Sequence, residues 1–287
     1  MALEISVRNS RLIKRPLSVN EIIGNSNWSY GTFDEHFRLV EGEADHGVFV
    51  VYDKDCIGRG VQFLDSKSSR EIGLCLLLPA TEGDVRMIYE MAERIARLWK
   101  SDHILVEGDR LDLSEIPSSV EFQKKSMKAI LRATGEANSG SSPVQLCCAT
   151  LPIWLSPDQF SDFAEDPAKF SEFLHDRQKT GAYLATALLL ELKGAVSSAY
   201  VVFDNAPIIL PYEPCLQFVQ DGLKYQCSKS YVIVSDLFTD EKYSQIEFSD
   251  FLERIPEGKK SEFDAKHFLL NPLTIDELKN IFRPSER

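Results

Sequence analysis

The stretch Ile72-Gly-Leu-Cys-Leu-Leu-Leu-Pro-Ala-Thr-Glu-Gly-Asp-Val-Arg-Met-Ile88 decides the fold of the first half of the chain. Its first seven residues, Ile72–Leu78, form an apolar run of strand length, and Pro79 ends that run. Thr81, followed three residues later by Asp84, predicts a capped helix, because each side chain can accept a hydrogen bond from a free backbone N–H. A strand followed directly by a capped helix predicts mixed α and β structure.

We expect this helix to run from Thr81 to about Lys100 with one apolar face. Its apolar residues recur three and four positions apart, which places them on one stripe. They are Val85, Ile88, Ala92, Ile95 and Trp99. The charged residues expected to face water are Arg86, Glu90, Glu93, Arg94 and Arg97. The helix is therefore predicted to cover a sheet.

Four strand candidates lie in series, joined by short connections rich in Gly and Asp. They are His36–Val40, Val48–Tyr52, Gly60–Leu64 and Ile72–Leu78. Such connections let neighbouring strands pair as antiparallel hairpins, so the sequence predicts a meander. Before these strands, Leu3–Val7 alternates apolar and polar residues, and Ser18 with Glu21 predicts a short capped helix that Gly24 ends.

A small, polar segment separates two well-patterned regions. Ala133-Thr-Gly-Glu-Ala-Asn-Ser-Gly-Ser-Ser-Pro143 cannot supply core, so it predicts a linker or a long surface loop. We expect residues 1–132 to form an antiparallel meander with covering helices, and residues 144–287 to form an acidic α+β second half. The fold class is therefore α+β, with largely antiparallel sheets and two sub-domains.

The second half predicts further strands and helices. The expected strands are Val144–Leu151, Val196–Phe203, Ile208–Leu210 and Tyr231–Val234. The expected helices are one capped by Ser156 and Gln159 with Pro157 at its first position, one over Gln178–Leu192, and one capped by Thr274 and Glu277. Core packing is the expected role of the apolar residues Phe160, Phe163, Phe170, Phe173 and Leu174.

Charge limits the partners. The chain has 44 acidic residues against 32 Lys and Arg, a formal net charge of −12 and a pI of about 5.0. Residues 1–132 carry −3 of this charge and residues 133–287 carry −9. Because a negative surface repels phosphate, we expect no nucleic acid partner and no anionic membrane partner.

The compartment is predicted from what the chain lacks. No apolar run approaches the roughly 18 to 20 residues that span a bilayer, and Met1–Arg15 has no signal-peptide core, so we expect a cytoplasmic protein. The six cysteines, which show no Cys-x-x-Cys spacing, are Cys56, Cys75, Cys147, Cys148, Cys215 and Cys227. We expect reduced, buried thiols, with a zinc site or a disulfide framework as the alternative.

No common catalytic motif is present: the chain has no glycine-rich nucleotide loop, no Gly-x-Ser-x-Gly elbow and no His-Glu-x-x-His pair. The histidines that adjoin an acid are His36, His46, His103 and His175. Adjacent residues on a strand point to opposite faces, so the rings of His36 and His103 are not expected to touch their neighbours. We expect no metal, no cofactor and no catalytic histidine, although triads of distant residues stay open.

Two charged faces are candidates for interaction. The acidic one is predicted on the helix that Ser156 begins, and its residues are Asp158, Asp162, Glu165 and Asp166. Carboxylates about one turn apart concentrate negative charge that could receive a basic protein partner. An ordinary solubilising face is the alternative. The basic face, on a helix that Ser118 and Glu121 begin and that ends near Arg132, consists of Lys124, Lys125, Lys128 and Arg132; it is solvated, binds an anion, or docks on the acidic second half.

Several segments resemble a family of uncharacterised bacterial proteins that share a domain of unknown function, known from Gram-positive cocci. They are Leu76-Leu-Leu-Pro-Ala-Thr-Glu-Gly-Asp84, Arg177-Gln-Lys-Thr-Gly-Ala-Tyr183, Tyr200-Val-Val-Phe203, Pro207-Ile-Ile-Leu-Pro211, Ile246-Glu-Phe-Ser-Asp-Phe-Leu252 and Phe263-Asp-Ala265. The resemblance implies a bacterial cytoplasmic origin and brings no activity or catalytic residues.

Three functions stay open after these exclusions. We expect a non-enzymatic protein that binds another protein, such as a regulator, a chaperone-like factor or an immunity protein against a toxin. The alternative is a small-molecule enzyme with a pocket between the two halves. Ligand sensing or a structural role is the third.

Overall fold

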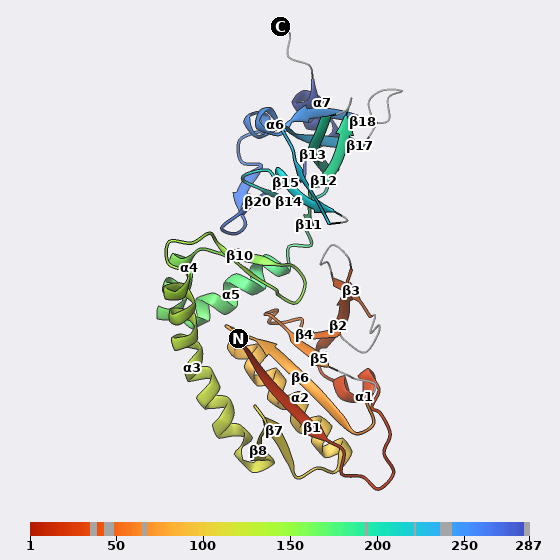
Figure 1. Cartoon of the computed structure of the whole chain (residues 1–287), viewed down its shortest axis with the longest axis vertical. Coiled ribbons are helices and arrows are strands. Elements are labelled where there is room, and N and C mark those ends of the chain that lie inside the picture. The colour runs from red at the N-terminus through yellow and green to blue at the C-terminus, as the bar shows by residue number, and fades with distance from the viewer. Residues whose placement is uncertain are drawn as a thin grey trace. The chain divides into compact units, whose positions relative to one another are not determined.

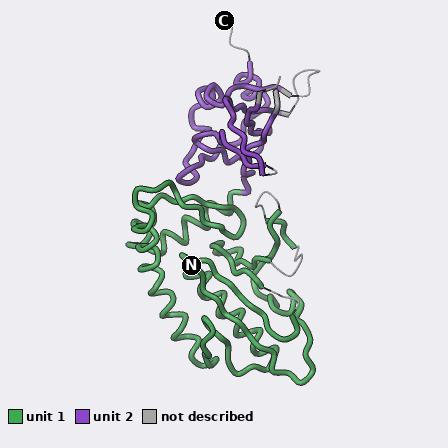
Figure 2. Tube along the Cα trace, in the orientation of Figure 1, with its two compact units in different colours: residues 1–180 green, residues 181–287 purple. Residues whose placement is uncertain are grey.

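The chain forms two compact units, Met1–Thr180 and Gly181–Arg287 (Figure 2). The computed structural model describes residues 1–34, 39–42, 49–64, 68–192, 195–220, 222–235 and 243–283. Helices and mostly antiparallel sheets make up both units, so the predicted α+β class is confirmed. The division falls after Thr180, whereas we predicted it at residues 133–143.

Unit 1 is built on an antiparallel sheet with the strand order β3-β2-β4-β5-β6-β1-β7-β8 (Figure 1). The strands are β1 (Ala2–Arg8), β2 (Trp28–Phe33), β3 (Leu39–Glu41), β4 (Phe49–Asp53), β5 (Val61–Leu64), β6 (Glu71–Leu77), β7 (His103–Val106) and β8 (Asp109–Asp112). The predicted meander holds for β4, β5 and β6. It fails at both ends, because β1 returns to pair with β6 and β7, and β2 separates β3 from β4. Of the predicted strand His36–Val40, residues 36–38 lie outside the described residues.

Helix α2 (Glu82–Trp99) packs on one face of this sheet, as predicted. Its capping box is the predicted one: Asp84 N donates to Thr81 Oγ1 over 3.0 Å, and Thr81 N donates to Asp84 Oδ2 over 3.1 Å. The buried part of α2 is wider than the predicted stripe. The reason is helix α3 (Ile116–Ala137), which packs on a second side of α2 and places Ser119 Oγ 2.8 Å from Tyr89 OH.

Arg94 on α2 does not face water, which corrects the prediction for this residue. Its guanidinium donates to the carbonyl oxygens of Ile22, over 2.9 Å, and of Ile23 at the end of α1 (Val19–Ile23). It also lies over the ring of Trp28, 5.1 Å from the centroid. Carbonyl groups at a helix C-terminus lack intrahelical partners and carry partial negative charge, so they attract the cation.

The predicted linker at residues 133–143 is wrong in its first part, because α3 continues to Ala137. Gly135, which we took for a linker residue, is buried in the helix. A Cβ atom there would lie 2.9 Å from the carbonyl oxygen of Pro157, at the start of α4 (Pro157–Glu165). The glycine therefore lets two helices approach closely. Ser118 does not cap α3 as predicted. It lies within the first turn of the helix, and its hydroxyl donates to Glu115 O.

The rest of unit 1 is the hairpin of β9 (Val144–Leu146) and β10 (Ile153–Leu155), followed by α4 and α5 (Pro167–Gln178). The hairpin replaces the single strand predicted over Val144–Leu151. The capping box predicted for α4 is confirmed, with Ser156 Oγ accepting from Gln159 N. The predicted core role is confirmed for Phe160, Phe170 and Leu174; Phe163 and Phe173 are half-buried, with ring centroids 5.3 Å apart.

The described residues of unit 2 form two four-stranded sheets, one separate hairpin and two helices. The first sheet has the order β11 (Tyr183–Leu184), β14 (Ile208–Pro211), β20 (His267–Leu270), β19 (Lys260–Glu262). The second has the order β12 (Leu188–Leu192), β13 (Ala195–Val202), β17 (Ser230–Ser235), β18 (Tyr243–Glu247). The hairpin is β15 (Gln217–Gln220) with β16 (Leu223–Gln226), and the helices are α6 (Phe248–Arg254) and α7 (Ile275–Phe282). The capping box predicted for α7 at Thr274 and Glu277 is confirmed.

The helix predicted over Gln178–Leu192 is wrong. Helix α5 ends at Gln178, and Gly181 follows with a φ of 62°, a backbone conformation that favours glycine. The apolar residues after it form β11 and β12, and every residue of Leu188–Leu192 pairs with β13. Strand pairing, which local sequence does not reveal, decides the structure of this segment.

Candidate functional site

The predicted acidic face lies on α4 and at its end. Asp158, Asp162 and Glu165 are exposed, and Asp166 is half-buried. Glu165 does not act as a free charge: its carboxylate accepts from Arg132 Nη2 over 2.6 Å and from Lys128 Nζ over 3.3 Å. These hydrogen bonds, foremost the one from Arg132, hold the pKa of Glu165 below its usual range.

These contacts also give a role to the basic face predicted on α3, for which three roles were left open. Lys128 and Arg132 on α3 dock on an acid of α4, which is the third of the three predicted roles. The acidic face that remains unpaired by α3 is therefore smaller than the predicted one. Asp166 has a longer contact within its own segment, 3.8 Å from Lys169 Nζ.

The histidines have structural partners. His103 Nδ1 lies 2.6 Å from Asp102 Oδ1, which corrects our prediction that they would not touch. Strand β7 begins at His103, so the alternation of strand faces does not apply to Asp102. His175 Nδ1 accepts from Ile57 N over 3.0 Å. His36 and His46 lie outside the described residues.

His267, the one histidine without an acidic neighbour in sequence, lies against a buried acid. Its Nδ1 is 2.9 Å from Asp264 Oδ1, and that oxygen also accepts from the backbone N–H groups of Lys266 and His267. The pair is three residues apart and closes the turn that leads into β20. A single carboxylate oxygen that accepts two backbone N–H groups is typical of a structural turn.

None of the six cysteines is joined to another in a disulfide bond, and their burial differs from the expected one. Cys75, Cys148 and Cys227 are buried, Cys56 is half-buried, and Cys147 and Cys215 are exposed. Cys147 follows the end of the short strand β9, so it is not inside a buried strand as predicted. Burial raises the pKa of the Cys56, Cys75 and Cys227 thiols, which makes them weaker nucleophiles at neutral pH.

A buried polar cluster surrounds Asp84 at the N-terminus of α2. The carboxylate, 2% exposed, accepts from Thr81 Oγ1 over 2.8 Å, from Arg59 N over 2.9 Å and from Gly60 N over 3.0 Å. A Cβ atom on Gly58 would lie 2.2 Å from Asp84 Oδ2, so only glycine fits there without displacement. The carboxylate fixes the loop that precedes β5 onto the start of α2.

The same cluster binds two further segments of unit 1. The Arg59 guanidinium donates to the carbonyl oxygens of Cys147, over 2.9 Å, and Pro79, over 3.2 Å. The Gln178 amide donates to Gly58 O over 2.7 Å and accepts from Thr150 N over 2.9 Å. These hydrogen bonds join protein groups to one another, so the cluster is explained as a structural tie.

Among the strands whose burial is described, those of the β15–β16 hairpin of unit 2 carry the most exposed large apolar side chains. Val219 is 73% exposed and Leu223 is 59% exposed. Among the described residues no third strand pairs with either edge of the hairpin. A strand that exposes large apolar side chains and has an open edge is the kind of surface that proteins ordinarily protect.

The register shows which backbone groups point outward. Cys227 N donates to Leu216 O over 2.8 Å, so residues 216 and 227 form a hydrogen-bonded pair. Because such pairs alternate in an antiparallel ladder, the opposed pairs Gln217↔Gln226 and Val219↔Lys224 are not hydrogen-bonded to each other. The N–H and C=O groups of Gln217 and Val219 therefore point away from β16.

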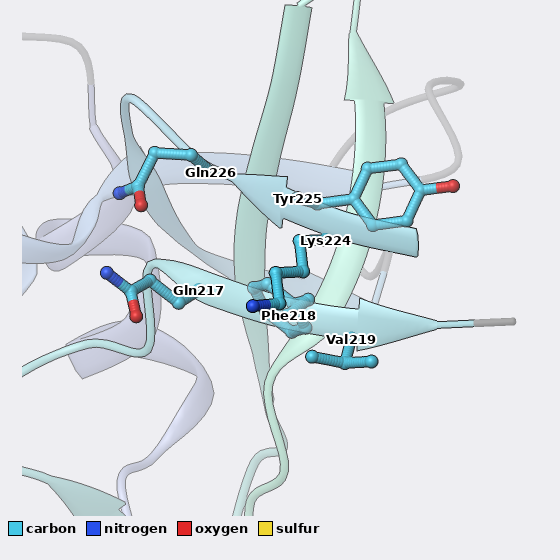
Figure 3. Close-up of a pocket in the computed structure, with 6 residues that line it drawn as sticks. All are labelled: Gln217, Phe218, Val219, Lys224, Tyr225 and Gln226. Atoms are coloured by element: carbon cyan, nitrogen blue, oxygen red, sulfur yellow. The ribbon is translucent and has the colours of Figure 1, made fainter. Parts of the chain in front are cut away.

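A cleft of about 520 Å³ accompanies the hairpin (Figure 3). Its lining residues are Gln217, Phe218, Val219, Lys224, Tyr225 and Gln226. The amides of Gln217 and Gln226 lie at the end away from the turn, and the Tyr225 hydroxyl points away from both strands (Figure 3). Among the described residues of this lining Lys224 is the only charged one, although the chain as a whole is strongly acidic.

Two contacts fix the start of the hairpin. Cys215 N donates to Tyr200 OH on β13 over 2.9 Å, and Cys215 Sγ lies 3.1 Å from Gln217 O. Burial raises the pKa of Tyr200 to about 12. The exposed thiol of Cys215 thus lies directly on the outward edge of β15.

Our sequence interpretation did not include this site, although a signal was present. The dipeptide Asp221-Gly222 between Gln217–Gln220 and Leu223–Gln226 is a typical hairpin turn sequence. Gly222 has a φ of 77°, as such turns require. The two strands are too polar and too short to stand out by alternation.

Among the described residues, no three His, Cys, Asp or Glu side chains are grouped so that they could hold a metal ion. None of the helices in those residues has the length and apolarity to cross a membrane.

Comparison with known proteins gives one family. No curated protein and no solved structure matches the chain. The family described as domain of unknown function DUF4299 matches residues 2–281, which is nearly the whole sequence and includes both units, the acidic face on α4 and the hairpin. The chain belongs to the DUF4299 family.

Proposed function

We propose that the chain is a non-enzymatic protein-binding protein of the bacterial cytoplasm, and that an extended segment of its partner adds as a strand to the β15 edge of the hairpin. The observation that carries this proposal is the position of Val219. Its side chain is exposed, and its backbone N–H and C=O groups point outward without a partner strand among the described residues. Strand addition satisfies such groups with main-chain hydrogen bonds.

The side chains around the edge favour a segment of particular chemistry. Val219 offers an apolar contact, and Lys224 lies opposite it on the same face of the hairpin. An apolar residue beside an acidic one in the partner would meet both groups. The amides of Gln217 and Gln226 can donate to and accept from a polar side chain further along.

The lining supports binding better than catalysis. The titratable groups among the described lining residues are Lys224 and Tyr225, which are adjacent on one strand and point to opposite faces. They do not form the close acid–base pair that proton transfer requires. The other four residues supply amide, aromatic and aliphatic contacts.

A pair of proline variants tests which edge is used. Val219→Pro removes an outward N–H and leaves the hydrogen bonds of the hairpin in place; Lys224→Pro does the same on the β16 edge. Random linear peptides displayed on phage would be selected on the wild-type protein and then measured on each variant. We expect about tenfold weaker binding to Val219→Pro, from one lost hydrogen bond and the ring's obstruction, and a small change for Lys224→Pro.

Thiol labelling gives an independent readout on the unmodified chain. Bound peptide should slow maleimide labelling of Cys215, whose thiol lies on the β15 edge. Cys147, an exposed thiol of unit 1, serves as the internal control and should label at an unchanged rate. Failure to select any peptide, or equal binding to both proline variants, would contradict strand addition at β15.

A further inference from the structure

The loop between β1 and α1 carries the most exposed pair of large apolar side chains in the described residues. Leu12 is 103% exposed and Ile13 is 85% exposed. The loop projects beyond the end of β1 (Figure 1). We call residues 11–15, Arg-Leu-Ile-Lys-Arg, the tip loop. Exposing two adjacent apolar side chains to water is unfavourable, and contact with an apolar medium would remove this cost.

The base of the tip loop is held in place by hydrogen bonds. Asn9 N donates to Arg70 O and Asn9 Nδ2 donates to Ser69 O, each over 2.8 Å. Arg11 N donates back to Asn9 Oδ1 over 3.0 Å, which closes a turn just before the apolar pair. Because the base is already ordered, the loop presents Leu12 and Ile13 without a large further loss of conformational entropy.

The far side of the tip loop is fixed as well. Arg15 forms two hydrogen bonds to the carboxylate of Glu21, over 3.0 Å and 2.5 Å. These bonds lower the pKa of Glu21 to about 2. Leu17, two residues on, is buried.

The surroundings of the apolar pair are basic although the whole chain is acidic. Arg11 and Lys14 flank the pair, and Ser10 N donates to Trp99 O, which brings the next residue, Lys100, to the base of the loop. Arg70 lies at the base through its contact with Asn9. In the described part of the chain these four cations form no ion pair. The nearby carboxylates of Glu21 and Glu71 are neutralised by Arg15 and Arg8.

We propose that the tip loop docks on an anionic lipid surface. Leu12 and Ile13 enter the boundary of the acyl chains, while Arg11, Lys14, Arg70 and Lys100 stay at the level of the lipid phosphates. This revises the expectation drawn from net charge. At physiological ionic strength charges are screened over about 8 Å, so the local cations of the tip loop decide the contact.

The geometry favours a lipid surface over an acidic protein. The apolar pair stands in a projecting loop, with Arg11 and Lys14 next to it in sequence and Arg70 and Lys100 at the base of the loop. A protein partner would need a socket of matching shape, whereas a bilayer offers apolar and anionic layers in the same order to any projecting tip. The contact is peripheral and reversible, because two apolar side chains bury little area.

Vesicle sedimentation of the full chain tests this docking. We would compare vesicles of phosphatidylcholine alone with vesicles in which about one third is phosphatidylglycerol, at low and at 1 M salt. We expect the wild type to sediment with the anionic vesicles only, and to be released by high salt. The variants Leu12→Ser with Ile13→Ser, and Lys14→Glu, should each reduce the bound fraction about tenfold.

The matched control is Val219→Ser with Leu223→Ser, which removes two exposed apolar residues from the hairpin of unit 2. This control should bind vesicles like the wild type, so failure of lipid docking and failure of the hairpin proposal are distinguishable. The proposal is overturned if the wild type stays in solution with anionic vesicles, or if Leu12→Ser with Ile13→Ser binds them equally. Retention on poly-glutamate beads in place of vesicles would also overturn it and indicate an acidic protein partner.

Discussion

The cluster around Asp84 and the β15–β16 hairpin show opposite ways of using polar and apolar groups. Around Asp84 polar groups are buried, and each hydrogen bond described there ends on another protein group. On the hairpin apolar groups are exposed, and backbone groups point outward without a partner strand in the described residues. The first arrangement has the residue types of an active site but only holds segments together. The second leaves apolar side chains exposed and backbone hydrogen-bonding groups without a partner strand in the described residues.

The largest effect in this comparison is expected for Asp84→Ala. The change removes the acceptor for the N–H groups of Arg59, Gly60 and Thr81 in a site without water access. We expect the free energy of unfolding to fall by about 3 kcal/mol or more, measured by urea denaturation. Asp162→Ala, on exposed α4, is the control and should change stability by less than about 0.5 kcal/mol. A loss of unfolding free energy in Asp84→Ala as small as that in Asp162→Ala would show that the buried cluster does not stabilise unit 1.

A smaller effect is expected at the attachment of the hairpin. Tyr200→Phe leaves Cys215 N without its acceptor, and we expect a loss of about 1 kcal/mol in the same assay. The phenol of Tyr200 has its pKa raised to about 12, so it should ionise well above the ordinary value near 10. Its contribution to stability is therefore complete below pH 10 and is lost as the pH rises through 12.

Ultraviolet absorbance at alkaline pH measures that ionisation, because phenolate formation changes the spectrum. The amplitude of the late transition should fall in Tyr200→Phe, and what remains belongs to Tyr52, because burial raises the pKa of that phenol to about 12 as well. Tyr225→Phe is the matched control, since its hydroxyl points away from the strands, and this variant should keep the late transition and the wild-type stability (Figure 3). A late transition of unchanged amplitude in Tyr200→Phe would show that Tyr200 does not contribute to it.

Breaking the ion pairs between α3 and α4 should lower the stability of the protein less than Tyr200→Phe does. The pKa of Glu165 lies below its usual range because of Arg132 first and Lys128 second. We expect Arg132→Gln to raise this pKa toward the ordinary value more than Lys128→Gln does, as measured by carboxyl NMR titration. The stability that the pair contributes is present above the ordinary pKa and is lost as the pH falls below it. An unchanged Glu165 titration in both variants would show that the pairs do not form in solution.

The acidic face on α4 stays a prediction, and its expected effect on stability is the smallest. Asp162→Lys combined with Asp166→Lys should leave the unfolding midpoint nearly unchanged, because Asp162 is exposed and Asp166 has only a long contact to Lys169. A basic partner recovered by the wild type at low salt should be lost by the double variant. Recovery of the same partners by both proteins at low and high salt would end this hypothesis.

Local signals in the sequence were sufficient where the structure depends on neighbours in the chain. The caps at Ser18, Thr81, Ser156 and Thr274 are all confirmed, because a capping box closes over three residues. The same locality misled us at Gly135, whose role depends on α4, and over Leu188–Leu192, whose structure depends on β13. Such long-range contacts are not encoded in short spacing patterns.

The candidate site was the least predictable part for a related reason. Exposure of Val219 and Leu223 is a property of the folded surface, and a polar strand of four residues gives no periodic signal. Net charge likewise concealed the basic tip loop, because it averages over the whole chain. The turn dipeptide Asp221-Gly222 was the one local clue to the hairpin.

The place of β1 in its sheet has a consequence for how the chain folds on the ribosome. Strand β1 is synthesised before the other strands, yet it pairs with β6 and β7, whose residues follow some seventy to one hundred positions later. Until β7 has emerged, the backbone groups along one edge of β1 have no partner strand. The sheet of unit 1 therefore cannot form strand by strand in the order of synthesis, because β1 must wait for β6 and β7 before both of its edges are paired.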